Sequence, residues 1–113
     1  MKKILVCLVA LVLLCGCASE KSSQDSKPRS PGTSEEAVKY CIDTCSEEKG
    51  SGVDLSNGPC LHEQIAADWV CDVAHNPRIE IDNRPENQCQ SFSSGLAHHF
   101  VEVDDECNLI RAV

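Results

Sequence analysis

Cysteine spacing constrains the fold of this 113-residue chain more than any other feature of its sequence. Three of the nine cysteines fall within the first seventeen residues, and the other six are spread over the rest of the chain. These six are Cys41, Cys45, Cys60, Cys71, Cys89 and Cys107. An even number of cysteines in a short exported segment predicts three disulfides, for which 15 connectivities exist. A thiolate metal site is the competing interpretation, and the absence of a CxxC pair disfavours it.

Residues 1–16 have the pattern of a secretory signal peptide. Lys2 and Lys3 precede an apolar run that extends from Ile4 to Leu14. As a helix this run would span about 16 Å, which is well short of a hydrocarbon core of about 30 Å, so we expect a cleaved signal. Export also places the six downstream cysteines in an oxidising compartment, where disulfides persist.

The segment Leu14-Cys15-Gly16-Cys17 resembles the lipobox of prokaryotic lipoproteins. In that family the cysteine after a small residue is linked to diacylglycerol through its thioether and becomes the new N-terminus. The resemblance implies that Cys17 is lipidated and that the protein is anchored by its lipid in the membrane of the cell envelope, outside the cytoplasm. Cys15 stands where Ala, Ser or Thr is more common, and an ordinary cleaved signal without lipid is the alternative.

Composition divides the remaining chain into a tether and one folded domain. Residues 18–33 hold no large apolar side chain and are rich in Ser, Lys and Pro, so 17–33 reads as a lipidated cysteine followed by a flexible tether. Residues 34–113 are long enough for one small domain with a modest core, which disulfides would supplement.

The expected domain, residues 34–113, is strongly acidic. It has five Lys or Arg against sixteen Asp or Glu, a net charge of −11. Such a domain repels phosphate backbones and anionic headgroups, so we expect no nucleic-acid partner and no membrane contact beyond the lipid. A cationic protein or ligand is compatible with this charge, and so is an acidic surface that serves only solubility.

The sequence predicts a small disulfide-rich α+β fold that begins with two helices cross-linked to each other. Thr33 and Glu36 form a capping-box pattern, and Gly50 and Gly52 would end the first helix. One face of that helix carries Val38, Cys41, Ile42 and Cys45.

The second helix is expected from about Pro59 until Asn76 and Pro77, with a stripe formed by Leu61, Ile65 and Trp69. Pairing Cys41 with Cys71 and Cys45 with Cys60 would suit antiparallel helices. Four residues of one helix span about 6 Å and eleven of the other about 16 Å, so both bridges require Cys60 to precede the helix.

The C-terminal third reads as a loop and a β-hairpin. Residues 78–94 are polar, carry turn signals and would be pinned by Cys89. Val101 and Val103 alternate with polar residues before Asp105 and Glu106, and residues 109–113 form a second apolar stretch, which predicts an acidic turn between two strands. The expected core therefore comprises the six cysteines with Val38, Ile42, Leu61, Ile65, Trp69, Val101 and Val103.

Three strings within residues 58–111 loosely resemble exported prokaryotic proteins, archaeal ones among them. The strings are DWVCDVAH, NQC and AHHFVEVDDECNLI. The resemblance implies export and no particular activity.

Histidines and carboxylates supply the candidate metal ligands. Asp68, Asp72 and His75 would lie on one side of the second helix. His98, Glu102 and Asp104 would share one face of the hairpin. If the two faces met, they would form a mixed site suited to Zn²⁺ or another first-row metal. Solvated faces of two amphipathic elements are the simpler interpretation, and under it the protein has no cofactor.

No catalytic site is expected. Six paired cysteines leave no thiolate nucleophile, and the serines near His98 lack a GxSxG turn. The sequence thus favours a lipid-anchored binding or interaction module of the cell envelope. A divalent-metal-binding lipoprotein and an inhibitor of a cationic envelope hydrolase are the alternatives.

Overall fold

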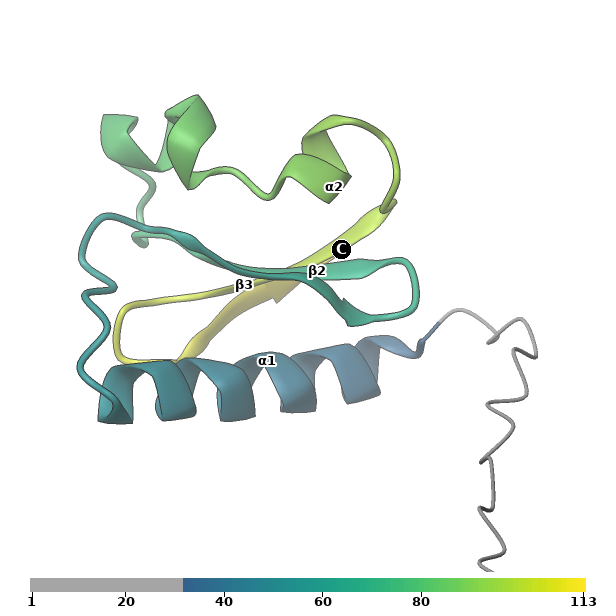
Figure 1. The fold of residues 1–113 in the computed structure, drawn as a ribbon, viewed down its shortest axis with the longest axis horizontal. Helices are drawn as coiled ribbons and strands as arrows, with labels where there is room; N and C mark the ends of the chain where they lie inside the picture. Colours follow the sequence, from purple (N-terminus) through teal and green to yellow (C-terminus); the bar gives the residue numbers. More distant parts are fainter. Residues whose placement is uncertain (1–31) are drawn as a thin grey trace, which may run out of the picture.

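The computed structural model describes residues 32–113, which form a four-stranded sheet with one long helix on one face (Figure 1). The order is β1-β2-β3-β4, with an antiparallel pair at each edge and the parallel pair β2 and β3 in the centre. The segment from 78 to 97, which joins the parallel strands, lies on the opposite face from α1 and contains three short helical turns. The signal peptide, Cys17 and residues 18–31 of the expected tether lie outside the described residues.

Helix α1 runs over Ser34–Gly50 and begins as predicted. The Thr33 hydroxyl accepts a hydrogen bond from the Glu36 amide, and the Glu36 carboxylate accepts one from the Thr33 amide, both at 3.2 Å. After Gly50 the chain leaves the helix, and Gly52 takes a positive φ of 88°. The buried face of α1 carries Ala37, Cys41 and Cys45.

The prediction of a second helix was wrong, because residues 60–73 form an antiparallel hairpin. Strand β1 is Cys60–Ala66 and strand β2 is Trp69–Val73. Leu61, Ile65 and Trp69 are spaced by four, which fits two strand repeats as well as one helical turn. The sequence WVCDV decides the outcome, since β-branched and aromatic side chains favour strands.

The C-terminal hairpin forms as predicted. Strand β3 is His99–Val103 and strand β4 is Leu109–Ala112, joined by an acidic turn. The polar segment before it contains η1 (Glu80–Asn83), η2 (Pro85–Asn87) and α2 (Gln90–Ser93). The expected pinning of this segment by Cys89 is confirmed, because Cys89 is bonded to Cys60.

All six downstream cysteines are paired. Cys41 bonds Cys71, as one of the two predicted pairings required. Cys45 bonds Cys107 rather than Cys60, because β1 is a strand and Cys60 is not on a second helix. The disulfides therefore tie α1 to the sheet and to the turn before β4, instead of joining two helices. Three disulfides indicate an oxidising environment outside the cytoplasm.

The hydrophobic core lies between α1 and the sheet. Trp69, Cys71 and Val73 of β2 and Val101 and Val103 of β3 point into it, together with buried residues of α1. Val38, Ile42, Leu61 and Ile65 are partly buried and pack against its edge, and Leu55 joins it from the loop after α1. Within residues 32–113 we find no helix with the length and hydropathy needed to cross a membrane.

Candidate functional site: a cavity on the open face of the sheet

A cavity of about 410 Å³ is lined by residues of the sheet and of the segment from 78 to 97. This segment lies on the face of the sheet opposite α1 (Figure 1). We call this cavity the open-face cavity. Its lining consists of Val70, Asp72, Arg78, Asn83, Gln88, Cys89, Phe92, Phe100, Glu102 and Arg111. A volume of this size is in the range of small-molecule sites in proteins.

Strand alternation explains why this face differs from the core. Successive side chains of a strand point to opposite sides, so Cys71 and Val73 face α1 while Val70 and Asp72 face the cavity. On β3 the same alternation turns Phe100 and Glu102 toward the cavity.

Strand register aligns the cavity floor in two rows. Asp72 is the register partner of Glu102, and Glu102 is the partner of Arg111, so these three form a polar row across β2, β3 and β4. Val70 is the register partner of Phe100, and these two form an apolar row. Because each row is separated from the next by two residues along a strand, the rows lie about 7 Å apart.

Glu102 is the centre of the ionic contacts in the cavity. Its side chain is almost fully buried and accepts hydrogen bonds from Arg78 at 2.7 Å and from Arg111 at 3.1 and 3.2 Å. Arg78 also donates to the Asp82 carbonyl and to the Asn83 side chain. One buried carboxylate is thus bound by two guanidinium groups, both partly exposed at the rim of the cavity.

Asp72 is the unusual member of the polar row. Its residue is 8% exposed, and its Oδ1 atom has no hydrogen-bond partner. Burial, and then the neighbouring charge of Glu102, raise the pKa of Asp72 to about 8, although Arg78 acts in the opposite direction. With a pKa of about 8 this carboxyl is mainly protonated at neutral pH, and its Oδ1 atom has no protein partner.

Several attachments hold the segment from 78 to 97 above the cavity. The first is the Cys60–Cys89 disulfide. The second is the fully buried Asp82 carboxylate, which accepts hydrogen bonds from the His75 amide, the His75 ring and the Ile79 amide at 2.9 to 3.1 Å. Burial alone would raise the pKa of Asp82, but these hydrogen bonds outweigh it and lower the pKa below its ordinary value.

Aromatic side chains form the apolar end of the cavity. The Phe92 and Phe100 rings meet edge to face with centroids 5.1 Å apart. The Arg111 guanidinium lies 5.0 Å from the centroid of the Phe100 ring, on which it stacks as a cation.

The predicted metal ligands separate into four locations. Asp68 and His98 do meet, with 2.7 Å between Oδ1 and Nδ1, in an exposed contact beside the turn between β1 and β2. Asp72 and Glu102 share the polar row, and His75 is bonded to Asp82. Asp104 accepts hydrogen bonds from the Glu106 and Asn108 amides, which stabilise the β3–β4 turn. The two faces therefore do not meet as a single six-residue site.

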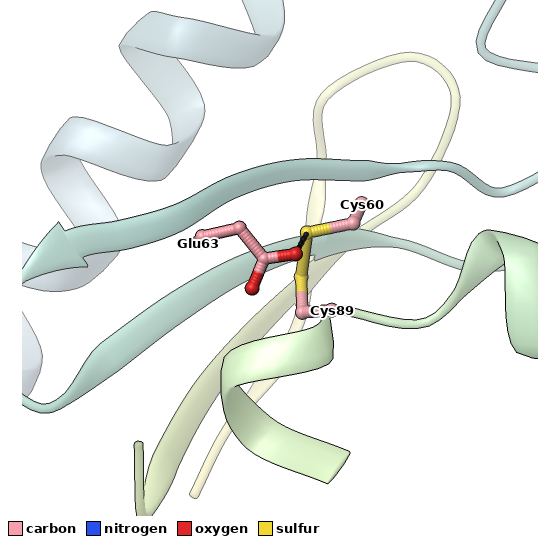
Figure 2. A group of neighbouring side chains, drawn as sticks. All are labelled: Cys60, Glu63 and Cys89. Carbon is pink, nitrogen blue, oxygen red and sulfur yellow. Dashed lines mark hydrogen bonds between the residues drawn. A yellow bond between two sulfur atoms is a disulfide. The ribbon is translucent and has the colours of Figure 1, made fainter. Parts of the chain in front are cut away.

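Figure 2 shows a different cluster of potential ligand atoms, formed by Cys60, Glu63 and Cys89. Its two sulfur atoms are joined in a disulfide, so neither is a thiolate. The Glu63 carboxylate already accepts hydrogen bonds from the Gln90 and Ser91 amides at 2.9 and 2.7 Å. Glu63 therefore attaches β1 to the segment above the cavity, and this arrangement does not fit a metal ion.

Most cavity residues were not identified from the sequence. Asp72 and Glu102 were proposed as metal ligands, whereas Arg78, Arg111, Phe92 and Phe100 were given no role in a site. The hairpin alternation could have placed Phe100 and Glu102 on the face away from the core. Arg78 lies after the end of β2, and no pattern in the sequence indicates that its side chain contacts Glu102.

Comparison with known proteins adds no further assignment. No protein-family model, curated protein or solved structure matches this chain.

Proposed function

We propose that this protein is a lipid-anchored binding module of the cell envelope that holds a small ligand in the open-face cavity. The signal peptide and lipobox pattern support export and anchoring through Cys17. The disulfides support an oxidising location.

The unpartnered Oδ1 atom of the buried Asp72 carboxyl is the observation that carries the binding proposal. A buried polar group without a partner costs about 1 to 3 kcal/mol, and a protein that needed only stability would do better with an apolar side chain there. A ligand that hydrogen-bonds Asp72 would remove this cost. Apolar walls combined with a few oriented polar groups are the usual composition of a small-molecule site.

Residue-specific NMR tests the binding proposal. The ¹⁵N-labelled full-length chain in detergent would be titrated with three probes that share a phenylpropyl body, namely 3-phenylpropionate, 3-phenylpropionamide and 3-phenylpropylamine. We expect at least one probe to shift the amide resonances of Val70, Phe100 and Glu102 saturably. If none of the three shifts these amides at millimolar concentration, the binding proposal is wrong.

Acyl labelling tests the anchor separately. Cys17→Ser removes the only thiol that the lipobox pattern assigns to the lipid, so we expect no acyl label and an unprocessed precursor. A Cys15→Ser variant is the matched control and should be labelled. Continued acylation of Cys17→Ser would contradict the anchor.

A further inference from the structure

The charge inside the open-face cavity is opposite to the charge of the domain around it. Residues 34–113 contain only five Lys or Arg side chains, and two of them, Arg78 and Arg111, converge on Glu102. Because the Asp72 carboxyl is protonated at neutral pH, the lining carries one negative and two positive charges. A net positive cavity in a domain of charge −11 is a local preference for an anion.

Arg111 also has hydrogen-bond donors that its contacts with Glu102 do not use. Glu102 accepts one hydrogen bond from Arg78 and two from Arg111. A guanidinium has five N–H donors, so Arg111 keeps donors that Glu102 does not use. Together with the protonated Asp72 carboxyl, these donors match the two oxygens of a carboxylate, which accepts planar paired hydrogen bonds well.

We propose that the ligand of the open-face cavity is a small monocarboxylate with an apolar body. This inference rests on the proposed function and gives its ligand a chemical class. The carboxylate lies beside the Arg111 guanidinium and within reach of Asp72. The charge of Glu102 between these two residues is already compensated by Arg78 and Arg111. The apolar body lies at the aromatic end of the cavity, against the exposed parts of the Phe92 and Phe100 rings.

The distance between the two rows of the cavity floor determines how far the carboxylate of such a ligand lies from its apolar group. Their separation of about 7 Å corresponds to a carboxylate joined to a ring or short chain through a few carbon atoms. Phe92 and Phe100 meet edge to face, so a planar or linear apolar body would contact one ring face and one ring edge. The volume of about 410 Å³ admits one such molecule.

Asp72 makes the binding dependent on pH. The charged groups that face it are Glu102 on β3, Arg78 and Asp82 on the segment after β2, and Arg111 on β4. Its protonated form donates to the ligand, and its ionised form repels the ligand. With a pKa of about 8, the protonated fraction falls about tenfold between pH 7 and pH 9.

The three-probe titration tests the inference on the wild-type protein. We expect 3-phenylpropionate to bind more tightly than the amide or the amine at pH 7 and to weaken about tenfold by pH 9. N-acetylphenylalanine also has a carboxylate but represents the C-terminus of a peptide. Comparing it with 3-phenylpropionate shows whether the carboxylate of the natural ligand belongs to a free acid or to a peptide. Tighter binding of either acid than of the amide and the amine at the cavity amides supports the carboxylate class.

Two variants locate the carboxylate. Arg111→Gln removes one positive charge and should weaken the affinity for 3-phenylpropionate at least tenfold. Arg84 lies outside the cavity, so the matched control Arg84→Gln should leave this affinity unchanged. Asp72→Asn keeps a donor but cannot ionise, so its affinity should be the same at pH 7 and pH 9.

Two outcomes of the titration would overturn the carboxylate inference. If the amine binds best and tightens from pH 7 to pH 9, the ligand is cationic, so the carboxylate inference fails and the binding proposal survives. Equal binding of the amide and the acid also overturns the inference. Because these comparisons use the wild-type protein, they remain decisive if Arg111→Gln fails to fold.

Discussion

The two faces of the sheet are built from the same strands and have different chemistry. On the α1 side, Cys71, Val101 and Val103 are fully buried among apolar neighbours, and two disulfides cross-link the layer. On the other side the strands present the ionic and protonated groups of the polar row beneath a segment with little regular structure. The comparison teaches that the α1 face supplies the stability that allows the open face to keep an unpartnered buried carboxyl.

Removing a disulfide from the α1 face should have the largest effect. The Cys41→Ala/Cys71→Ala double variant opens a loop between positions 30 apart, which is worth about 3.6 kcal/mol through chain entropy. Voids at two fully buried positions add about 1 to 2 kcal/mol. Guanidinium unfolding of the full chain should show that the unfolding free energy falls by about 5 kcal/mol. A fall below about 2 kcal/mol would contradict the conclusion that the α1 face supplies most of the stability.

The equivalent change on the open face should cost less stability and act locally. The Cys60→Ala/Cys89→Ala double variant opens a loop of nearly the same length, so the loss from chain entropy is again about 3.6 kcal/mol. Because Cys60 is only partly buried, its replacement leaves a smaller void. Hydrogen exchange should accelerate in the segment from 78 to 97 and not in α1. Uniform acceleration across the domain would mean that the two faces are not distinct.

The pH dependence of stability should trace to the open face. The pKa of Asp72 is about 8 in the folded protein, well above its value in the unfolded chain, so the folded state binds this proton more tightly. The stability that the protonated group contributes is complete below pH 4 and is lost as the pH rises through 8. We expect the unfolding free energy to fall by about 4 kcal/mol between pH 5 and pH 8 in the wild type.

Asp72→Asn should abolish this decline, because an amide does not titrate. Asp105→Asn, which changes an exposed carboxylate in the β3–β4 turn, is the matched control and should keep the wild-type pH profile. An unchanged profile in Asp72→Asn would show that this carboxyl is ionised in the folded protein.

The smallest effect should come from the helix cap. Thr33→Ala removes the hydroxyl that accepts the Glu36 amide and should destabilise the domain by about 1 kcal/mol. Chemical denaturation measures this loss. Binding of 3-phenylpropionate at the open-face cavity should be unchanged. A loss of binding would show that the two faces are energetically coupled.

Local signals account for the parts of the fold that the sequence predicts. The capping box at Thr33 and the alternation around Val101 depend on neighbouring residues, and both α1 and the β3–β4 hairpin form where expected. The hairpin at 60–73 was missed because a spacing of four satisfies both helical and strand periods. The cavity was missed because its residues come together only through strand register and through the path of the chain from Arg78 to Ala97.

The titration of Asp72 itself tests the central claim most directly, because the claim is that this buried carboxyl, with its unpartnered Oδ1 atom, belongs to a binding site. Its ¹³Cγ chemical shift would be followed from pH 4 to pH 10, with and without 3-phenylpropionate. We predict a pKa of about 8 without the probe and a higher pKa with it, since an anion favours the protonated form. An ordinary acidic pKa, or a pKa that the probe leaves unchanged, would contradict the account.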